Sequence, residues 1–184
     1  MSGRLGPLHV RRAVPEDAAE IVRLVDALNA HQRDPTGILT VNHIRAHAFG
    51  TEPWFHAVVA AAATADGRLV GVALWERAFE LAYAVRGAYL SAIWVDPDYR
   101  RRGVARAMLD LVAADVSALG GSYVWWVSQE WNAAAHATYQ RLGAIEKPVK
   151  AHALLYGEFE AAAARGAGAG AEADAGAAPA AEDR

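Results

Sequence analysis

The order of apolar and polar positions predicts six strands and four helices over the first 160 residues. Short apolar or alternating runs between turn residues predict the strands, which span 8–13, 55–62, 68–75, 89–95, 123–127 and 151–156. Apolar residues at helical spacing predict the helices, which span 14–30, 41–49, 104–119 and 132–142. The order β-α-α-β-β-β-α-β-α-β predicts an α/β (α+β) fold, with a mixed sheet and helices on both faces.

The connections between these elements carry recognisable turn signals. Asp66-Gly67 predicts the tight turn of a hairpin, and residues 76–87 fit an extension of both neighbouring strands. Asp96-Pro97-Asp98 ends the strand 89–95, because proline has no N–H group for the ladder.

Three tryptophans are interpreted as core residues rather than as substrate-stacking residues. Trp125 and Trp126 are adjacent in a predicted strand, so their side chains must point to opposite faces. This arrangement predicts that the strand 123–127 is buried on both sides. Trp94 lies in the central apolar run and is assigned to the core in the same way.

The composition changes after residue 160. From Ala161 onward the chain consists almost entirely of Ala, Gly, Glu and Asp, which cannot bury enough apolar surface to fold. We therefore expect one domain over 1–160 and a disordered tail over 161–184, with at most the first turn of the tail helical.

The bulk composition excludes several classes. A formal charge of −3 argues against a general nucleic-acid binder, and the absence of cysteine excludes disulfides and thiolate metal sites. Residues 1–7 lack an apolar run of signal-peptide length, and no stretch has the length of a membrane span. We expect a soluble, cytoplasmic protein that binds neither a membrane nor nucleic acid.

A metal site is not predicted. His43 and His47 stand four residues apart, as two ligands on one helix face would. No nearby carboxylate completes a His-Glu-x-x-His pattern, so both are read as exposed helix histidines.

The clearest chemical signal is the start of the helix 104–119. A strand, a proline turn, the arginines Arg100 to Arg102, Gly103 and an amphipathic helix follow one another in that order. A helix start offers unpaired N–H groups and a partial positive charge, and the small side chains of Gly103 and Ala105 let a ligand approach the backbone. The pattern predicts a pyrophosphate site. The alternatives are a solvated basic helix start, or arginines that contact a nucleic acid.

Two motifs in this chain resemble signatures of the GNAT superfamily of acyl-CoA N-acyltransferases. Arg100-x-x-Gly103-x-Ala105 is similar to the Arg/Gln-x-x-Gly-x-Gly/Ala signature that binds the CoA pyrophosphate. The second signature runs from Asn132 to Ala144 and contains Ala135, Tyr139 and Leu142-Gly143. The resemblance covers about residues 8–160 and implies a mostly antiparallel sheet of six to seven strands.

Within the superfamily, the chain is most similar to the spermidine/spermine (diamine) and thialysine N-acetyltransferase branch. The local similarities are Glu130-Trp131-Asn132, Ile38-Leu39-Thr40 and the Phe49-Gly50-x-x-Pro53-Trp54-Phe55-His56 run. Polyamine-acetylating members carry adjacent acids after a Tyr-Leu pair on the central strand. This chain has Ser91-Ala92 at that place.

The resemblance implies direct transfer of an acetyl group from acetyl-CoA to a primary amine of a small molecule: a diamine, a polyamine, thialysine or a lysine-like amine. The chain would act as a homodimer without a metal. Alternatives are a non-catalytic acyl-CoA-binding or regulatory module of the same fold, and acetylation of a protein amine. The implied cofactor-binding residues are Ile93, Trp94, Val95, Arg100, Arg101, Arg102, Gly103, Val104, Ala105, Arg106, Asn132, Ala135 and Tyr139.

The chemistry requires a neutral amine, an oxyanion site and a proton for the leaving thiolate. Neutralising an alkylammonium of pKa ~10.4 at pH 7 costs roughly 4.6 kcal/mol. Glu76, Glu80, Glu130 and His31 are open candidates for the base, and none is favoured by spacing. Backbone N–H groups of the central strand would bind the oxyanion. By resemblance, Tyr139 is the acid, with a purely structural core tyrosine as the alternative.

Overall fold

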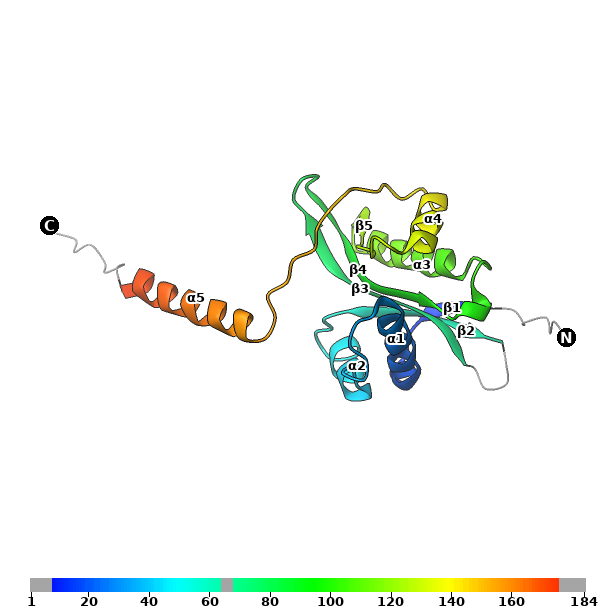
Figure 1. The fold of residues 1–184 in the computed structure, drawn as a ribbon, viewed down its shortest axis with the longest axis horizontal. Helices are drawn as coiled ribbons and strands as arrows, with labels where there is room; N and C mark the ends of the chain where they lie inside the picture. Colours follow the sequence, from blue (N-terminus) through cyan, green and yellow to red (C-terminus); the bar gives the residue numbers. More distant parts are fainter. Residues whose placement is uncertain (1–7, 64–67, 176–184) are drawn as a thin grey trace. The chain divides into compact units, whose positions relative to one another are not determined.

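The computed structural model describes residues 8–63 and 68–175 (Figure 1). The chain divides into two compact units, Met1–Ile145 and Glu146–Arg184. The first unit holds the sheet and four of the helices, and the second holds the helix α5, Gly157–Ala175. The predicted turn at Asp66-Gly67 lies outside the described residues.

The first unit is built on one five-stranded sheet in the order β1-β2-β3-β4-β5. Its strands are β1 (Leu8–Arg12), β2 (His56–Ala62), β3 (Leu69–Glu80), β4 (Val85–Val95) and β5 (Tyr123–Trp125). Strands β1 to β4 are antiparallel, and β5 runs parallel to β4. The mixed, mostly antiparallel sheet is confirmed, but within residues 8–63 and 68–175 it has five strands rather than six or seven.

All four predicted helices are present, and polar side chains cap two of them. They are α1 (Ala18–Gln32), α2 (Val41–Ala48), α3 (Val104–Ala118) and α4 (Ala133–Arg141), with short 3-10 turns at Pro15–Asp17 and Pro97–Tyr99. The Thr40 hydroxyl accepts a hydrogen bond from the His43 N–H at 3.2 Å, which satisfies one of the unpaired donors at the start of α2.

Two apolar layers hold the helices on the sheet (Figure 1). Helices α1 and α2 cover one face, where Ile21, Leu24 and Ile44 are fully buried. Helix α3 covers the other face, where Met108 and Val112 are fully buried. The layers thus confirm the prediction of helices on both faces. Trp94 is buried in the α1/α2 layer, as its core assignment predicts.

Residues 76–87 do extend both neighbouring strands. Strand β3 continues to Glu80 and β4 begins at Val85, so a long hairpin closes through residues 81–84. The register shifts between Leu74 and Trp75, which marks a bulge opposite Ser91. The bulge lies near the middle of β4, where the candidate site is found.

Strand β5 corrects the prediction of a buried strand over 123–127. It ends at Trp125, whose side chain is 39% exposed, and Val127 is also exposed. The reason is the place of β5 at the edge of the sheet: an apolar run there leaves one flank and one face uncovered. Trp126 is partly buried against the α3 layer, so only one of the two tryptophans is a core residue.

The second unit differs from the sequence prediction in two ways. Residues 151–156 form no strand, and no described strand pairs with them. Residues 161–175, expected to be disordered, belong to helix α5, because alanine has the highest helix propensity and dominates this segment. The boundary of the folded domain at residue 160 stays a prediction.

Candidate active site

The parting of β4 from β5 creates a free strand edge in the middle of the first unit. Strand β5 pairs with β4 only from Gly87 to Tyr89, whereas β4 continues to Val95. Residues 90–95 therefore have no described strand on that side. An extended molecule with amide groups can bind such an edge as an added strand. The predicted cofactor residues Ile93, Trp94 and Val95 lie at the end of this edge.

The turn after β4 has the backbone geometry of an anion site. Arg101 and Gly103 both adopt left-handed conformations, with φ of 59° and 79°. Left-handed residues at alternate positions of a turn direct successive backbone N–H groups toward one concave site. Helix α3 begins at Val104, directly after this turn. A Cβ atom built on Gly103 meets nothing within 4 Å, so the space in front of the backbone is open. The turn therefore fits a diphosphate.

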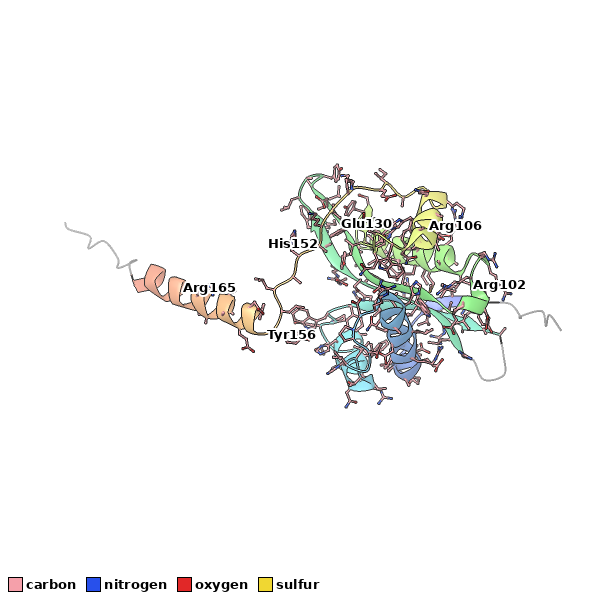
Figure 2. The ribbon with its side chains drawn as sticks, in the orientation of Figure 1. Arg102, Arg106, Glu130, His152, Tyr156 and Arg165 are labelled. Carbon is pink, nitrogen blue, oxygen red and sulfur yellow. The ribbon has the colours of Figure 1, made fainter. Side chains whose placement is uncertain are left out.

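The four arginines around this turn have different surroundings. Arg100 folds back on its own strand: its Nε donates to the Val95 carbonyl at 2.9 Å, and its guanidinium lies 4.5 Å from the centroid of the Trp94 ring. It fixes the loop on the strand. Arg101, Arg102 and Arg106 are exposed, and Figure 2 labels the last two near the start of α3. Arg106 lies 3.8 Å from Asp110, an exposed pair that leaves it accessible to a ligand.

Two of the predicted cofactor residues can offer a ligand little more than their backbone N–H groups. Val104 is buried in the α3 layer, and Ala105 packs partly against it. Their N–H groups belong to the first turn of α3, where no earlier carbonyl in the helix can accept from them. These N–H groups are the donors that the sequence motif predicts.

Helix α4 brings Tyr139 next to the segment that follows β5. The Asn132 side chain accepts a hydrogen bond from the Ala135 N–H at 3.2 Å and caps the helix. The Tyr139 ring meets Trp126 edge-on, with ring centroids 5.1 Å apart. Burial raises the pKa of Tyr139 above its ordinary value of 10.0. Its hydroxyl makes no hydrogen bond to any described residue, so it is available to a ligand.

A groove lies on the α1/α2 side of β4. Its volume is about 1400 Å³, and it reaches Ser91 and Ala92 at the centre of the sheet. Three carboxylates line it, one each from the loop after α1, the segment before β2 and strand β3: Asp34, Glu52 and Glu76. The sequence motifs did not identify Glu52 or Ser91 as groove residues. Glu52 stands two positions before Trp54, which lines the same groove.

The structure separates the four candidates for the base. Glu76 lines the groove, and Glu80, Glu130 and His31 do not. Glu80 lies at the hairpin end and accepts from the Ala82 N–H at 3.0 Å. His31 lies between two tryptophans, with ring centroids 5.4 Å from Trp94 and 5.5 Å from Trp131.

The surroundings of Glu76 favour its neutral form more than water does. Burial raises the pKa of Glu76 above 4.5, and a hydrogen bond with Ser91 opposes the rise only in part. Its register partner on β4 is Tyr89, whose pKa is raised by burial and by the charge of Glu76. Tyr89 is also the last residue of β4 that pairs with β5. Glu76 thus lies where β4 becomes free.

The described residues contain no cluster of three side chains that could hold a metal ion. His43 and His47 have ring centroids 6.4 Å apart on α2. None of the described helices is both long and apolar enough to cross a membrane.

The first unit thus combines a sheet that parts beside the turn at Gly103 with a groove across the central strand. The model of the Acetyltransferase (GNAT) family matches residues 24–144, and the chain belongs to this family. The protein is therefore an acetyl-CoA-dependent N-acetyltransferase, as the two motifs indicate.

Two groups of curated relatives differ in their acceptors. The thialysine N-epsilon-acetyltransferase of Bos taurus is 28% identical over 141 residues, covering 73% of this chain and 82% of that protein. The [ribosomal protein bS18]-alanine N-acetyltransferase of Escherichia coli strain K12 is 31% identical over 124 residues, covering 64% of this chain and 80% of that protein. The relatives thus agree on amine acetylation and include both a small-molecule and a protein acceptor.

Solved structures share the fold. An aminoglycoside acetyltransferase from an uncultured soil metagenomic sample, in complex with trehalose, superimposes with a TM-score of 0.66 at 17% identity. It covers 81% of this chain and 97% of its own. A ribosomal-protein-alanine N-acetyltransferase from Brucella melitensis biovar Abortus 2308 gives a TM-score of 0.62 at 18% identity, with 82% and 100% covered. These similarities establish the fold alone.

Proposed function

We propose that the protein transfers the acetyl group of acetyl-CoA directly to a primary amine of a small molecule: a diamine, a polyamine, thialysine or a lysine-like amine. The observation that carries this proposal is the position of Glu76. It lines the groove on one side of β4, at the residue pair where the strand edge becomes free for the thioester. Acceptor and donor can therefore meet at the centre of β4.

Acetyl-CoA would lie along the free edge and end at the turn before α3. The backbones of Ile93 to Val95 would hold the pantetheine arm, and the N–H groups of residues 101–106 would bind the diphosphate. Arg101, Arg102 and Arg106 add positive charge. Asn132 and Ala135 start the helix that carries Tyr139, on the other side of the thioester.

Glu76 is assigned as the base that neutralises the acceptor. Its raised pKa brings the carboxylate closer to the pKa of an ammonium group, so the proton transfer is less uphill than to an ordinary glutamate. An ammonium of pKa ~10.4 still costs roughly 4.6 kcal/mol to deprotonate at pH 7, which makes a positioned base valuable. Glu76 takes the proton directly or through one water molecule.

Transfer then proceeds in one displacement. The amine nitrogen attacks the thioester carbonyl, backbone N–H groups of β4 stabilise the oxyanion, and the carbon–sulfur bond breaks. The thiolate takes a proton from the Tyr139 hydroxyl, and the second proton lost by the acylated nitrogen restores that hydroxyl. A phenol of pKa ~10 and a thiol of pKa ~8.5 differ by ~2 kcal/mol, and the buried setting of Tyr139 makes this a lower bound.

The acceptor side favours a cation. Asp34, Glu52 and Glu76 line the groove, against one arginine, Arg77, and the histidines His43 and His56. Carboxylates in a groove raise the local concentration of an amine substrate. Because β4 carries Ser91-Ala92 rather than adjacent acids, these carboxylates come from the neighbouring elements.

A protein amine is the second candidate. It is supported by the relative that acetylates the alanine of ribosomal protein bS18, since that relative matches 64% of this chain. A groove of about 1400 Å³ is also large enough for the end of a peptide. A cytoplasmic location and a homodimer stay predictions from the sequence.

A thiol-release assay with acetyl-CoA tests the proposal. The panel contains a diamine, spermidine, thialysine, lysine, an aminoglycoside and a peptide with an N-terminal alanine. We expect kcat/KM for at least one free amine to exceed that for the peptide by about 10-fold or more. A preference for the peptide would support the second candidate. Acetyl-CoA binding without turnover on the entire panel would support the non-catalytic alternative.

A further inference from the structure

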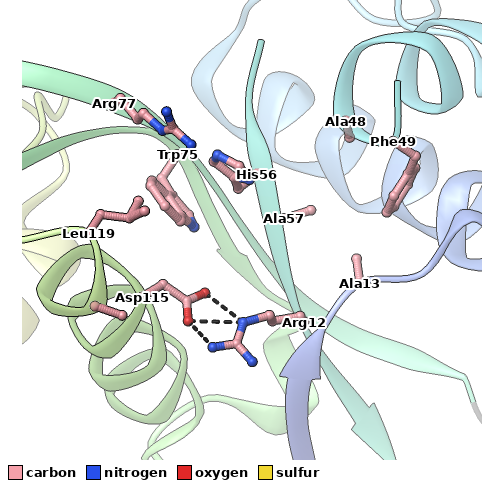
Figure 3. Close-up of a pocket in the computed structure, with 11 residues that line it drawn as sticks. Arg12, Ala13, Ala48, Phe49, His56, Ala57, Trp75, Arg77, Asp115 and Leu119 are labelled. Atoms are coloured by element: carbon pink, nitrogen blue, oxygen red, sulfur yellow. Dashed lines mark hydrogen bonds and ion pairs between the residues drawn. The ribbon is translucent and has the colours of Figure 1, made fainter. Parts of the chain in front are cut away.

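A second pocket lies at the far end of α3 from the anion-binding turn (Figure 3). Its volume is about 360 Å³, and its walls come from β1, β2, β3 and the ends of α2 and α3. The walls are mostly apolar and include Ala13, Phe49, Ala57 and Leu119. Val104 starts α3 and Asp115 lines the pocket, so about 16 Å of helix separates the pocket from the turn.

The Trp75 indole is the unusual feature of this pocket. Its side chain is 2% exposed, and its Nε1–H has no hydrogen-bond acceptor among the described residues. Figure 3 shows the ring facing the pocket between His56 and Asp115. A buried donor without an acceptor costs about 1–3 kcal/mol, so an acceptor from a bound molecule would recover that cost.

The charges around Trp75 favour a negatively charged acceptor. Asp115 is neutralised by Arg12, whose Nε donates to both carboxylate oxygens at 2.9 and 3.1 Å. Arg77 lines the pocket and makes no ion pair with a described residue. The pKa of His56 is lowered by burial first and by the charge of Arg77 second, so His56 is neutral at pH 7. Arg77 is therefore the uncompensated charge of the pocket.

We propose that this pocket binds the carboxylate of a small molecule with a short apolar body, with Arg77 pairing the charge and the Trp75 Nε1–H donating a hydrogen bond. The apolar body would lie against the side chain of Leu119, at the end of α3. The pocket shares Arg77 and His56 with the groove, but its lining includes neither Glu76 nor any predicted cofactor residue. It goes beyond the proposed function and adds an effector site to the enzyme.

The probe is 4-methylpentanoate, with 4-methylpentanamide as the uncharged molecule of the same shape. Binding to the full chain is measured by calorimetry without acetyl-CoA, and the six tryptophan indole N–H resonances are followed by NMR. Trp75→Phe assigns the Trp75 resonance. We expect saturable binding of the acid, a shift of that resonance, and affinity for the amide lower by about 10-fold or more.

Two variants complete the test. Arg77→Leu should weaken binding of 4-methylpentanoate by about 10-fold or more, while leaving the indole in place. Arg45→Leu removes an exposed arginine of α2 that does not line the pocket, and should leave the affinity unchanged. Equal affinity for acid and amide, or binding unaffected by Arg77→Leu, would overturn the proposal. So would an unshifted Trp75 resonance at saturation, because the indole would then be satisfied by water alone.

Discussion

Glu76 and Tyr89 lie opposite each other in the register of β3 and β4, and Tyr89 is the last residue of β4 that pairs with β5. One pair of residues therefore joins the groove to the free strand edge. An acid supplied by β3 can act on the same point of β4 as an acid on β4 itself. If Glu76 is the base, as proposed, this relationship accounts for the presence of Ser91-Ala92 rather than acids on the central strand.

Glu76→Gln should lower kcat by about 10²-fold or more, because the amide keeps the size of the side chain but cannot take a proton. The affinity for acetyl-CoA should stay the same, since the anion-binding turn at Gly103 follows the far end of β4. Thiol release and acetyl-CoA binding are measured on one preparation. Glu80→Gln is the control: it removes a carboxylate of the same strand that lies at the hairpin end, and it should leave kcat unchanged.

The pH profile gives an independent test of Glu76. A base must be ionised, and the pKa of Glu76 is raised above 4.5, so turnover of the parent should fall as pH decreases through that raised value. Turnover of Glu76→Gln should lack this acidic limb. An identical acidic limb in both proteins would assign the limb to another group and remove Glu76 from the mechanism.

Gly103→Glu should weaken acetyl-CoA binding by about 10²-fold or more, because a carboxylate would occupy the open space in which the diphosphate is proposed to bind. The matched control is Gly37→Glu. Gly37 has nearly the same left-handed φ, 72° against 79°, and equally open surroundings, so it carries the same backbone strain. If both variants lost the same acetyl-CoA affinity, the loss would come from backbone strain, and Gly103 would not be part of the diphosphate site.

Much of the fold could be predicted because the spacing of apolar residues along the sequence indicates which face of a helix or strand is buried. The helices α1 to α3 and strands β1 to β4 bury apolar side chains wholly or in part, and their apolar spacing shows it. Strand β5 and residues 151–156 have the same kind of apolar run. Whether such a run pairs with neighbours depends on the rest of the sheet, which the local pattern does not contain.

The candidate site also has a part that could be predicted from the sequence and a part that could not. The anion-binding turn at Gly103 is formed by one continuous segment, so its strand, turn and helix start could be predicted from adjacent residues. Asp34, Glu52 and Glu76 line the groove from three separate segments, and no spacing along the chain predicts that they share it. The orphaned indole of Trp75 is also invisible in the sequence, since it depends on which acceptors surround it.

Asp17→Asn should lower the melting temperature at pH 7 by about 3–10 °C, because hydrogen bonds to a charged group contribute roughly 1.5–3 kcal/mol. Arg11 donates two hydrogen bonds to Asp17, at 2.6 and 2.9 Å, and the Val14 N–H donates a third at 2.8 Å. Burial alone would raise the pKa of Asp17, but the Arg11 hydrogen bonds, the Val14 N–H and the Arg11 charge outweigh it and lower the pKa.

A lowered carboxyl pKa means that the folded state favours the charged form. The contribution of Asp17 is therefore complete above its unfolded pKa, near 3.8, and is lost as pH falls through the lower folded value. The difference in melting temperature between parent and variant should shrink over that acidic range. A difference that is constant down to pH 2 would contradict the assignment. Asp98→Asn, at an exposed position, is the control.

Removing the residues after Arg165 should change neither the melting temperature nor turnover beyond experimental error. The deleted segment is rich in alanine and glycine and offers no apolar face that could be buried against the first unit. Thermal unfolding and thiol release of the shortened chain test this expectation. Loss of several degrees would mean that helix α5 stabilises the folded domain.

Tyr139→Phe separates the acid role of this tyrosine from its packing role. The substitution keeps the ring against Trp126 and removes only the hydroxyl. If Tyr139 protonates the leaving thiolate, kcat should fall by roughly 10²-fold or more, while acetyl-CoA affinity stays within a factor of a few. Turnover and cofactor affinity are measured together.

The control for Tyr139 is Tyr156→Phe, which removes the hydroxyl of an exposed tyrosine in the second unit. A structural tyrosine would give the reverse pattern: a small loss of stability and turnover within a factor of a few. Turnover near that of the parent would assign the proton to water.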